Sequence, residues 1–346
     1  MTLICIEEHA LHGPTDAAAG ATLLHHAPYM SGQSSSSTPV ARGNGRRPAV
    51  DMATARRLGA DLGTGRIHEM DRHGIDVSVV SWTSPTQLAP DDVATALARS
   101  ANDQLAAAVA AHPDRLAGFA TLPWQHPDDA VAELDRAVTE LGLRGVLIVG
   151  RPGEEFLDAP VHRPVLRRIA DLDVPLYLHP FPPLRQVQQA YYAGFDDKVT
   201  TELSLGGWGW HHEAGIHALR LILAGIFDEL PELQIISGHW GEMVPFYLPR
   251  LDDVLSPGDT GLSRTITDTY RSHVWVTPSG MYHRPQFDYV RDVVGIDRII
   301  WSTDYPFLHL DGTQDFLGGL DLSHGEREQV THGNAERLLG LTTQRL

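Results

Sequence analysis

Histidines and acidic residues follow several apolar segments of this 346-residue chain. The first such segment is ICIEEHALHG (residues 4–13), in which Glu7 and His9 come after three apolar residues. Side chains alternate between the two faces of a strand, so a strand here would point Glu7 and His9 to one face and Glu8 to the other. A carboxylate and an imidazole that converge at a strand end form either an ion pair or part of a metal site.

Four more polar residues stand in similar places: His179 in LYLHP, His239 and Glu242 in ISGHWGE, and Asp304 in WSTDYP. Nitrogen and oxygen donors from the first, fifth and eighth apolar segments can surround one divalent cation, and the mixed set suits Zn²⁺ or Mn²⁺. Singly, each has a simpler interpretation, such as an arginine partner for Glu7 or a turn cap for Asp304. Together, several buried acids need cationic partners, and few lysines or arginines stand at these ends.

The elements that would position these residues alternate along the chain. Short runs rich in Val and Ile predict eight strands, at residues 3–9, 76–82, 116–124, 143–150, 174–180, 233–241, 273–280 and 298–306. Amphipathic segments predict helices at residues 51–73, 91–112, 127–141, 160–172, 211–230 and 323–340. Strands that are apolar throughout indicate a parallel sheet buried on both faces.

Eight such units in a chain of this length predict an α/β fold of the (β/α)8 TIM-barrel type, a single domain over residues 1–346. An open doubly wound sheet is the alternative. No G-x-G-x-x-G or Walker-type glycine loop follows a predicted strand, which disfavours a nucleotide site. In a barrel the polar residues above share the face where the strands end, which is where barrel enzymes carry their active sites.

One connection does not fit this regular pattern. Residues 10–50 contain MSGQSSSSTPVARGNGRRP (30–48), which is rich in Ser, Gly and Pro. We expect an irregular insertion here. It is either a lid that brings Tyr29, His25 or His26 beside a pocket, or a mobile surface excursion.

Composition narrows the class of protein. The net charge of −17 argues against a broad basic surface for nucleic acid or an anionic membrane. The single cysteine, Cys5, excludes a disulfide within the chain. No apolar stretch reaches the roughly 18 residues of a membrane span, and no secretion signal is visible at the start. We therefore expect a soluble cytoplasmic protein.

Several segments resemble a known family. The segments IEEHA, YLHP, WSTDYPF and HGNAERLLG, and above all the long block WGWHHEAGIHALRLILAGIFDELPELQIISGHWGEMVPFYLPRLD, are similar to the metal-dependent decarboxylase branch of the amidohydrolase superfamily. That branch includes γ-resorcylate, 2,3-dihydroxybenzoate, 5-carboxyvanillate and aminocarboxymuconate semialdehyde decarboxylases. The resemblance covers residues 3 to about 341, interrupted at 10–50.

The resemblance implies a distorted barrel with one catalytic metal, Zn²⁺ or Mn²⁺. The ligands it implies are Glu7, His9, His179 and Asp304. His239 and Glu242 would form a catalytic dyad beside the metal. Arg250 matches an arginine that reaches the substrate of a neighbouring subunit, which implies a homodimer or homotetramer.

The resemblance also suggests a mechanism, in which the substrate is an aromatic acid with a hydroxyl ortho to its carboxylate. The metal would chelate both groups, Asp304 would protonate the ring carbon, and His239 would polarise the hydroxyl. Phe181 and Trp208 could form apolar walls, although core packing explains such residues equally well. Two alternatives remain. One is a metal-dependent hydrolase or hydratase that uses the same site. The other is a barrel that has lost catalysis and serves in binding or assembly.

Overall fold

The structure is a computed structural model that describes residues 2–28 and 50–342. Within them, parallel strands form one sheet of order β1-β2-β3 and another of order β4-β5-β6-β7. The strands are β1 (Ile4–Ala10), β2 (Val77–Trp82), β3 (Leu116–Gly118), β4 (Val146–Val149), β5 (Leu176–His179), β6 (Ile235–Ser237) and β7 (Val274–Val276).

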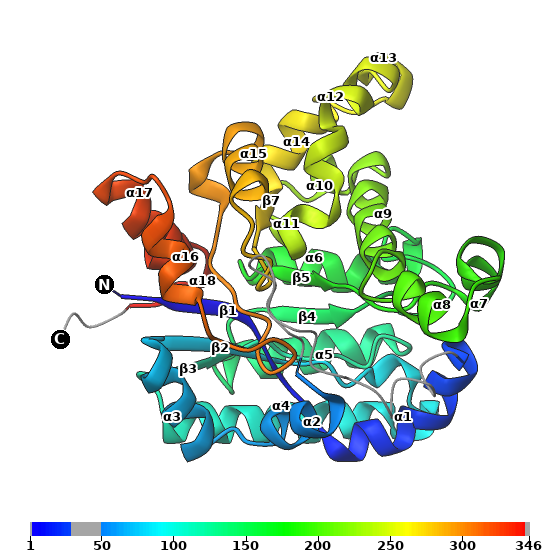
Figure 1. Ribbon diagram of the computed structural model, residues 1–346. Coiled ribbons are helices and arrows are strands. Elements are labelled where there is room, and N and C mark those ends of the chain that lie inside the picture. Colours follow the sequence, from blue (N-terminus) through cyan, green and yellow to red (C-terminus); the bar gives the residue numbers. More distant parts are fainter. Residues whose placement is uncertain (1, 29–49, 343–346) are drawn as a thin grey trace.

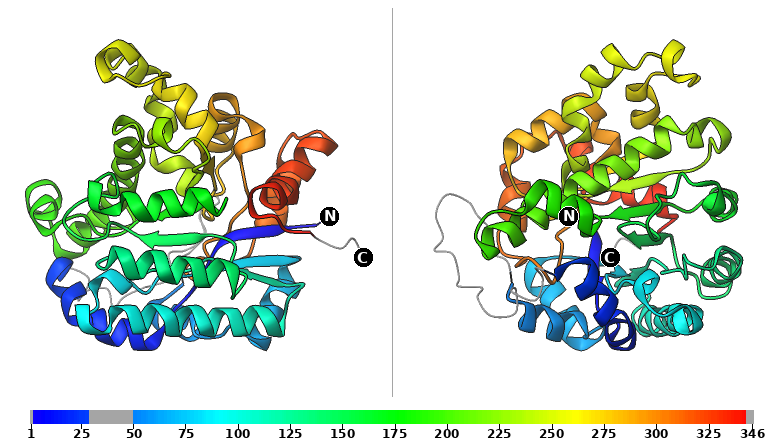
Figure 2. Two further views of the ribbon diagram at one scale, coloured as in Figure 1. Left: turned by 180° about the vertical axis from the view of Figure 1, so that it is seen from behind. Right: turned by 90° about the vertical axis from the view of Figure 1, so that its right-hand side faces the viewer.

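Three parallel bridges close these sheets into one cylinder: Ala120 with Val146, Val276 with Ile299, and Ile6 with Ser302. The segment 299–302 therefore takes the place of the eighth strand between β7 and β1. The fold is a distorted (β/α)8 barrel, as the sequence predicts, and the alternative of an open sheet is wrong. Helices lie around the outside of the strands (Figures 1 and 2).

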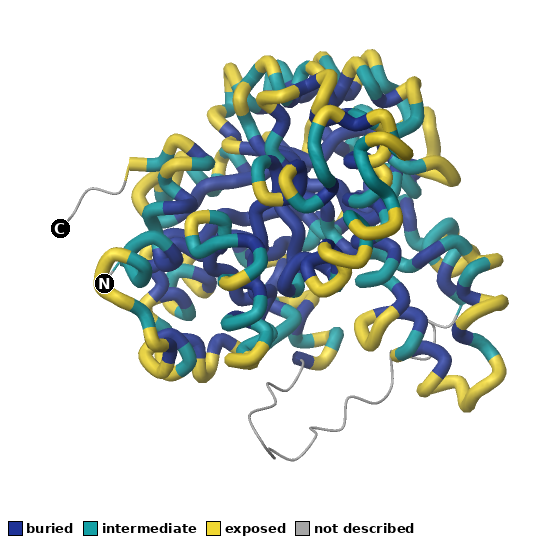
Figure 3. Tube along the Cα trace, turned by 90° about the horizontal axis from the view of Figure 1, so that it is seen from above, coloured by how far each residue is buried: buried dark blue, intermediate teal, exposed yellow. Residues whose placement is uncertain are grey.

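Two apolar layers hold the barrel together, and Figure 3 shows the buried residues concentrated at its centre. The inner layer contains residues from the seven strands and from the segment 299–302, including Ile4 and Ile6 of β1. Ala335 and Leu339, which lie outside the barrel, also pack in this layer. The outer layer includes Leu3 and Cys5, and it joins the strands to the helices. This alternation along β1 explains why the strand is apolar throughout, since both of its faces are buried.

Helices of the first half of the chain cover one side of the barrel. They are α1 (Gly13–His26), α2 (Met52–Gly59), α3 (Thr64–His73), α4 (Asp91–Ala111), α5 (Pro127–Thr139) and α6 (Arg163–Asp171). The predicted stretch 51–73 is interrupted between α2 and α3. Asp51 caps α2 by accepting a hydrogen bond from the Thr54 N–H at 2.9 Å.

Apart from α9, the helices of the second half of the chain have 11 residues or fewer. They are α7 (Arg185–Val187), α8 (Asp197–Ser204), α9 (Gly209–Leu223), α10 (Ile226–Glu229), α11 (His239–Glu242), α12 (Val244–Val254), α13 (Pro257–Thr260), α14 (Ile266–His273), α15 (Arg284–Val294), α16 (Thr313–Gly319), α17 (His324–Glu328) and α18 (Asn334–Leu339). Gly225, at φ 70°, separates α9 from α10 within the predicted helix 211–230.

The expectation of irregular chain over residues 10–50 is wrong for its first part. Helix α1 occupies residues 13–26, with Pro14 in its first turn followed by an alanine-rich run. Gln188 ties the end of α1 to the connection after β5, because its Nε2 donates to the carbonyl of His26 at 2.9 Å. Tyr29 and almost all of the proposed lid, residues 29–49, lie outside the described residues.

The strands are shorter than predicted, most clearly at 116–124 and 298–306. The predicted runs remain buried, but their last residues leave the ladder and turn across the mouth of the barrel. None of the described helices combines the length and the apolar character needed to cross a membrane.

Candidate metal centre

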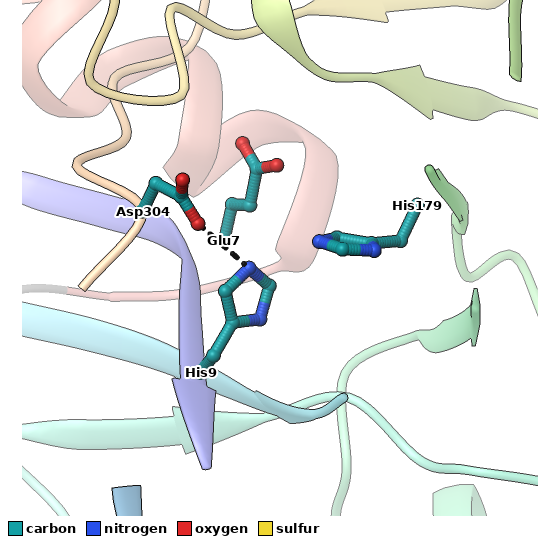
Figure 4. A group of neighbouring side chains, drawn as sticks. All are labelled: Glu7, His9, His179 and Asp304. Carbon is teal, nitrogen blue, oxygen red and sulfur yellow. Dashed lines mark ion pairs between the residues drawn. The ribbon is translucent and has the colours of Figure 1, made fainter. Parts of the chain in front are cut away.

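Four of the predicted side chains meet at the mouth of the barrel (Figure 4). Glu7 and His9 come from β1, His179 is the last residue of β5, and Asp304 follows the segment 299–302 in the position of the eighth strand. One donor atom from each lies within 4.8 Å of those of the other three. Glu7 and His9 are fully buried, whereas 15% of the Asp304 side chain is exposed. Elements distant in the sequence thus bring two imidazoles and two carboxylates into one group.

A bulge in β1 allows both Glu7 and His9 to face this group. The pairing with β2 shifts between Ile6 and Glu8, so that Glu7 is an extra residue with φ 66°. Without the bulge, strict alternation after the inward-facing Ile6 would point Glu7 and His9 out of the barrel and Glu8 into it. Strand alternation alone predicts that Glu7 and His9 share a face, but only the bulge makes it the inner one.

The imidazoles of His9 and His179 are oriented by their Nδ1 atoms. Nδ1 of His9 lies 3.2 Å from the Ser81 hydroxyl on the neighbouring strand, and Nδ1 of His179 lies 2.7 Å from the Pro180 carbonyl. Each contact leaves Nε2 for the centre of the group. Nε2 of His9 is buried and makes no hydrogen bond to any residue that the structure describes. Its nearest charged neighbour is Oδ1 of Asp304 at 3.3 Å, and a buried nitrogen with no hydrogen bond beside a carboxylate oxygen is suited to metal ligation.

The two oxygens of Glu7 have different surroundings. Oε2 accepts hydrogen bonds from the hydroxyls of Thr277, at 3.0 Å, and Ser279. Oε1 is buried and, among the described residues, has no hydrogen-bond partner. A Cβ at Gly238 would lie 2.9 Å from Oε1, so the absence of a side chain there keeps this oxygen accessible from within the barrel.

Electrostatics favour a cation at this place. Burial raises the pKa of Glu7, so its ionised form needs a positive neighbour. Burial, together with the nearby imidazoles of His9 and His239, holds the pKa of His179 well below its usual range. A neutral imidazole can bind a metal through its lone pair. The four residues therefore fit a divalent cation with mixed nitrogen and oxygen ligands.

Glu8, next to Glu7 in the sequence, has partners of its own. Its carboxylate accepts hydrogen bonds from the Thr303 N–H at 2.9 Å and the Thr303 hydroxyl at 2.6 Å. Burial raises the pKa of Glu8 to about 8, against the opposing effects of Thr303 and the guanidinium of Arg66. Glu8 thus connects β1 to the residue before Asp304, a role that the sequence does not reveal.

His239 and Glu242 form a second group beside the first. Nδ1 of His239 lies 2.7 Å from Oε1 of Glu242 and 3.9 Å from Oε1 of Glu7. Burial alone would lower the pKa of His239, but the carboxylates of Glu242 and Glu7 raise it to about 9. The structure therefore pairs these residues, as the resemblance implies, next to Glu7.

Sequence reasoning missed a third member of this second group. Nδ1 of His211, from α9, lies 2.8 Å from Oε2 of Glu242, and the rings of His211 and His239 are 4.3 Å apart. Burial alone would raise the pKa of Glu242, but the imidazoles of His239 and His211 hold it below its usual range. His211 lies in the WGWHHEAG segment, and only its distance from Glu242 in space shows that it belongs here.

The backbone is strained around both groups. The residues Glu7, His239, Glu242, Ser279 and Asp304 have φ values between 45° and 66°. Non-glycine residues adopt this left-handed region at a cost of about 1–3 kcal/mol each, and such residues cluster at functional sites. Glu7 is at the bulge within β1, and the other four residues follow the ends of β6, β7 and the segment 299–302, where the chain turns across the mouth of the barrel.

The three predicted substrate-binding residues lie in different surroundings. Phe181 is half-buried and packs against the inner layer beside Gly150. Trp208 precedes α9, and 48% of its surface is exposed. Arg250 is exposed on α12, near the exposed rings of Phe246 and Tyr247 on the same helix. The structure does not bring Arg250 together with the four-residue group of its own chain.

Known proteins are similar to this chain in sequence and fold. The profile of a family described as amidohydrolase matches residues 37–341. Decarboxylase orsB of Emericella nidulans is 35% identical over 80% of this chain and 85% of that protein. A gamma-resorcylate decarboxylase of Rhizobium sp. is 36% identical, over 81% of this chain and 88% of its own. The crystal structure of a dihydroxybenzoic acid decarboxylase from Polaromonas sp., with bound manganese and the inhibitor 2-nitroresorcinol, has a TM-score of 0.83 and 30% identity, covering 98% of this chain and 97% of that one.

Proposed function

The chain belongs to the amidohydrolase family, and on that basis we propose that it is a metal-dependent, non-oxidative decarboxylase of a hydroxyaromatic carboxylic acid. The proposed metal ligands are Glu7, His9, His179 and Asp304. The observation that carries the proposal is the pair of buried atoms without hydrogen bonds, Nε2 of His9 and Oε1 of Glu7, within this group.

The bound cation would supply positive charge that draws in the carboxylate and the ortho-hydroxyl of the substrate and fixes the ring. Manganese in the Polaromonas relative makes Mn²⁺ a suitable ion, and the same donor set accepts Zn²⁺. Relatives that act on dihydroxybenzoates suggest an ortho-hydroxybenzoate as substrate.

We assign the proton donor to Asp304. Decarboxylation breaks the bond between the ring carbon and the carboxylate, leaves the electron pair on the ring and releases CO₂. A proton must therefore reach that ring carbon. Asp304 is more exposed than Glu7 and His9, so substrate and solvent can both reach it. Water restores its proton after each turnover.

His239 would stabilise the negative charge that develops on the ring oxygen. Its Nδ1 is engaged by Glu242 at 2.7 Å, which leaves Nε2 for the substrate hydroxyl. The neighbouring carboxylate of Glu242 raises the pKa of His239 and so favours the positively charged imidazole beside the substrate oxygen.

Apolar and charged residues at the rim would bind the ring and its substituents. Phe181 and the half-exposed Trp208 are our candidates for the walls. Arg250 is exposed and apart from the group of its own chain, so we assign it to the substrate of a neighbouring subunit in a homodimer or homotetramer. The neighbouring Phe246 and Tyr247, 67% and 56% exposed, suit such a contact between subunits.

A panel assay tests this function. The purified protein, loaded with Mn²⁺ or Zn²⁺, is incubated with ortho-hydroxybenzoates while CO₂ release is measured, and with lactones and amides while acid release is measured. We expect CO₂ from at least one hydroxybenzoate and no acid release. Acid release without CO₂ would favour the hydrolase alternative and refute the decarboxylase.

A further inference from the structure

The carboxylate of Glu242 is held from both sides. Its side chain is fully buried, His239 contacts Oε1 at 2.7 Å, and His211 contacts Oε2 at 2.8 Å. The catalytic pair alone needs only the first of these contacts. The second contact comes from a different element, α9, and the function proposed above does not explain it.

These three side chains are close enough together to suggest a second metal site, but their distances contradict it. Donor atoms about 2.0–2.2 Å from one tetrahedral ion lie about 3.4 Å from each other. The separations of 2.7 and 2.8 Å are instead those of charge-assisted hydrogen bonds. Protons, rather than a cation, fill the space between these atoms.

The surroundings of His211 decide which of its nitrogens carries the proton. Nε2 lies 3.0 Å from the indole Nε1 of Trp210 and 3.0 Å from the carbonyl oxygen of Gly206. When Trp210 donates to Nε2, the proton of a neutral ring is on Nδ1. When Nε2 donates to Gly206 instead, Nδ1 still faces the Glu242 carboxylate at 2.8 Å. In both cases Nδ1 donates to Glu242, and a carboxylate can only accept.

We propose that His211 is a positioning residue that fixes the carboxylate of Glu242, and through it the orientation of His239. This inference rests on the proposed function and extends it to a residue that does not touch the substrate. By donating to Oε2, His211 prevents rotation of the carboxylate, so Oε1 always faces Nδ1 of His239. Nε2 of His239 then faces the substrate hydroxyl in each turnover.

Loss of this contact should weaken catalysis more than binding. Without His211, Oε2 of Glu242 would be buried without a partner, and the carboxylate could rotate away from His239. Partners of this kind, one step removed from the reacting groups, contribute about 10- to 100-fold to activity. Since the metal ligands are unaffected, metal content should not change.

Two substitutions at one position test the proposal. His211→Leu removes the donor, whereas His211→Asn keeps an N–H close to the place of Nδ1. We expect His211→Leu to lower kcat by about 10- to 100-fold with KM changed less than about threefold. His211→Asn should keep kcat within about threefold of the original. His212→Leu, next in the helix and without a contact to Glu242, is the matched control.

Crystal structures of the two variants give a readout that does not need activity. We expect Glu242 to leave His239 in His211→Leu and to stay in His211→Asn, with one metal ion per chain in both. Full activity of His211→Leu, equal damage in both variants, or loss of metal would overturn the proposal. If the unaltered protein releases no CO₂ from any substrate, the proposed function fails, while the position of Glu242 in the variants still decides this inference.

Discussion

Two groups of histidines and carboxylates lie next to each other at the mouth of the barrel, and they differ in their hydrogen bonds and in the spacing of their donor atoms. In the first, Nε2 of His9 is 3.3 Å from Oδ1 of Asp304, a spacing suited to two ligands of one ion. In the second, imidazole protons occupy both oxygens of Glu242 at 2.7 and 2.8 Å. Residue type alone therefore does not distinguish a metal site from a hydrogen-bonded group.

The same contrast separates two adjacent residues of β1. Glu8 has the N–H and hydroxyl of Thr303 for its two oxygens, and the guanidinium of Arg66 nearby. Glu7 has hydroxyl donors on Oε2 only, and its Oε1 has no hydrogen bond within the described part of the chain. A buried carboxylate with hydrogen-bond donors for both oxygens has a structural role. One with a buried oxygen that accepts no hydrogen bond indicates a ligand site.

The largest expected effect comes from Asp304→Asn in the first group. The amide keeps the shape of the side chain but cannot deliver a proton, so kcat should fall by about 10³-fold or more, with the melting temperature nearly unchanged. The exposed Asp311→Asn is the control and should keep full activity. Turnover near the original rate in Asp304→Asn would remove this residue as the acid.

Removal of the metal comes next and separates the two groups directly. A chelator should lower activity at least about 100-fold, and Mn²⁺ or Zn²⁺ should restore it. The melting temperature should fall with the metal, since an ion at 100 times its Kd stabilises the native state by about 2.7 kcal/mol. Calorimetry and rate measurements on the same samples check both effects. Unchanged activity in the stripped protein would contradict a metal-dependent reaction.

Adjacent substitutions in β1 sharpen the comparison further. Glu7→Gln should weaken metal binding by about 10- to 100-fold, because the amide lacks the negative charge that faces the ion. Glu8→Gln should keep one metal per chain and lower the free energy of unfolding by about 1–3 kcal/mol instead, through its hydrogen bonds with Thr303 and the nearby charge of Arg66. Metal titration followed by thermal unfolding distinguishes them. Equal metal loss in both variants would show that the two carboxylates do not differ as described.

The smallest of these effects is expected outside both groups. Arg250→Ala should raise KM about tenfold with little change in kcat, because the guanidinium would bind the substrate of a neighbouring subunit without joining the chemistry. Arg72→Ala, also exposed but on α3, is the control. Steady-state kinetics check this prediction. An unchanged KM in Arg250→Ala would disprove the shared site.

The sequence predicts the barrel well because its strands are apolar throughout and nearly all are separated by amphipathic segments. Strand ends are predicted poorly, since a run such as LAGFATLPW stays buried beyond β3 and beyond the bridge at Ala120, where its pairing ends. Helix α1 is missed because the serine-rich segment that follows it dominates the composition of residues 10–50.

The site is predicted in its residue types but not in its geometry. Glu7 and His9 are found from the strand end, yet the bulge that turns them inward has no sequence signal such as glycine. The sequence does not predict that His211 belongs to the site, because only the packing of α9 beside α11 brings it to Glu242. Contacts of this kind depend on the closure of the whole barrel rather than on local pattern.

The central claim is that one divalent cation is held by Glu7, His9, His179 and Asp304, and that His211, His239 and Glu242 hold only protons. Anomalous diffraction from crystals grown with Mn²⁺ tests it most directly. We predict a single peak within about 2.0–2.3 Å of one donor atom from each of the four residues. A peak between His211, His239 and Glu242, or none among the four, would contradict the account.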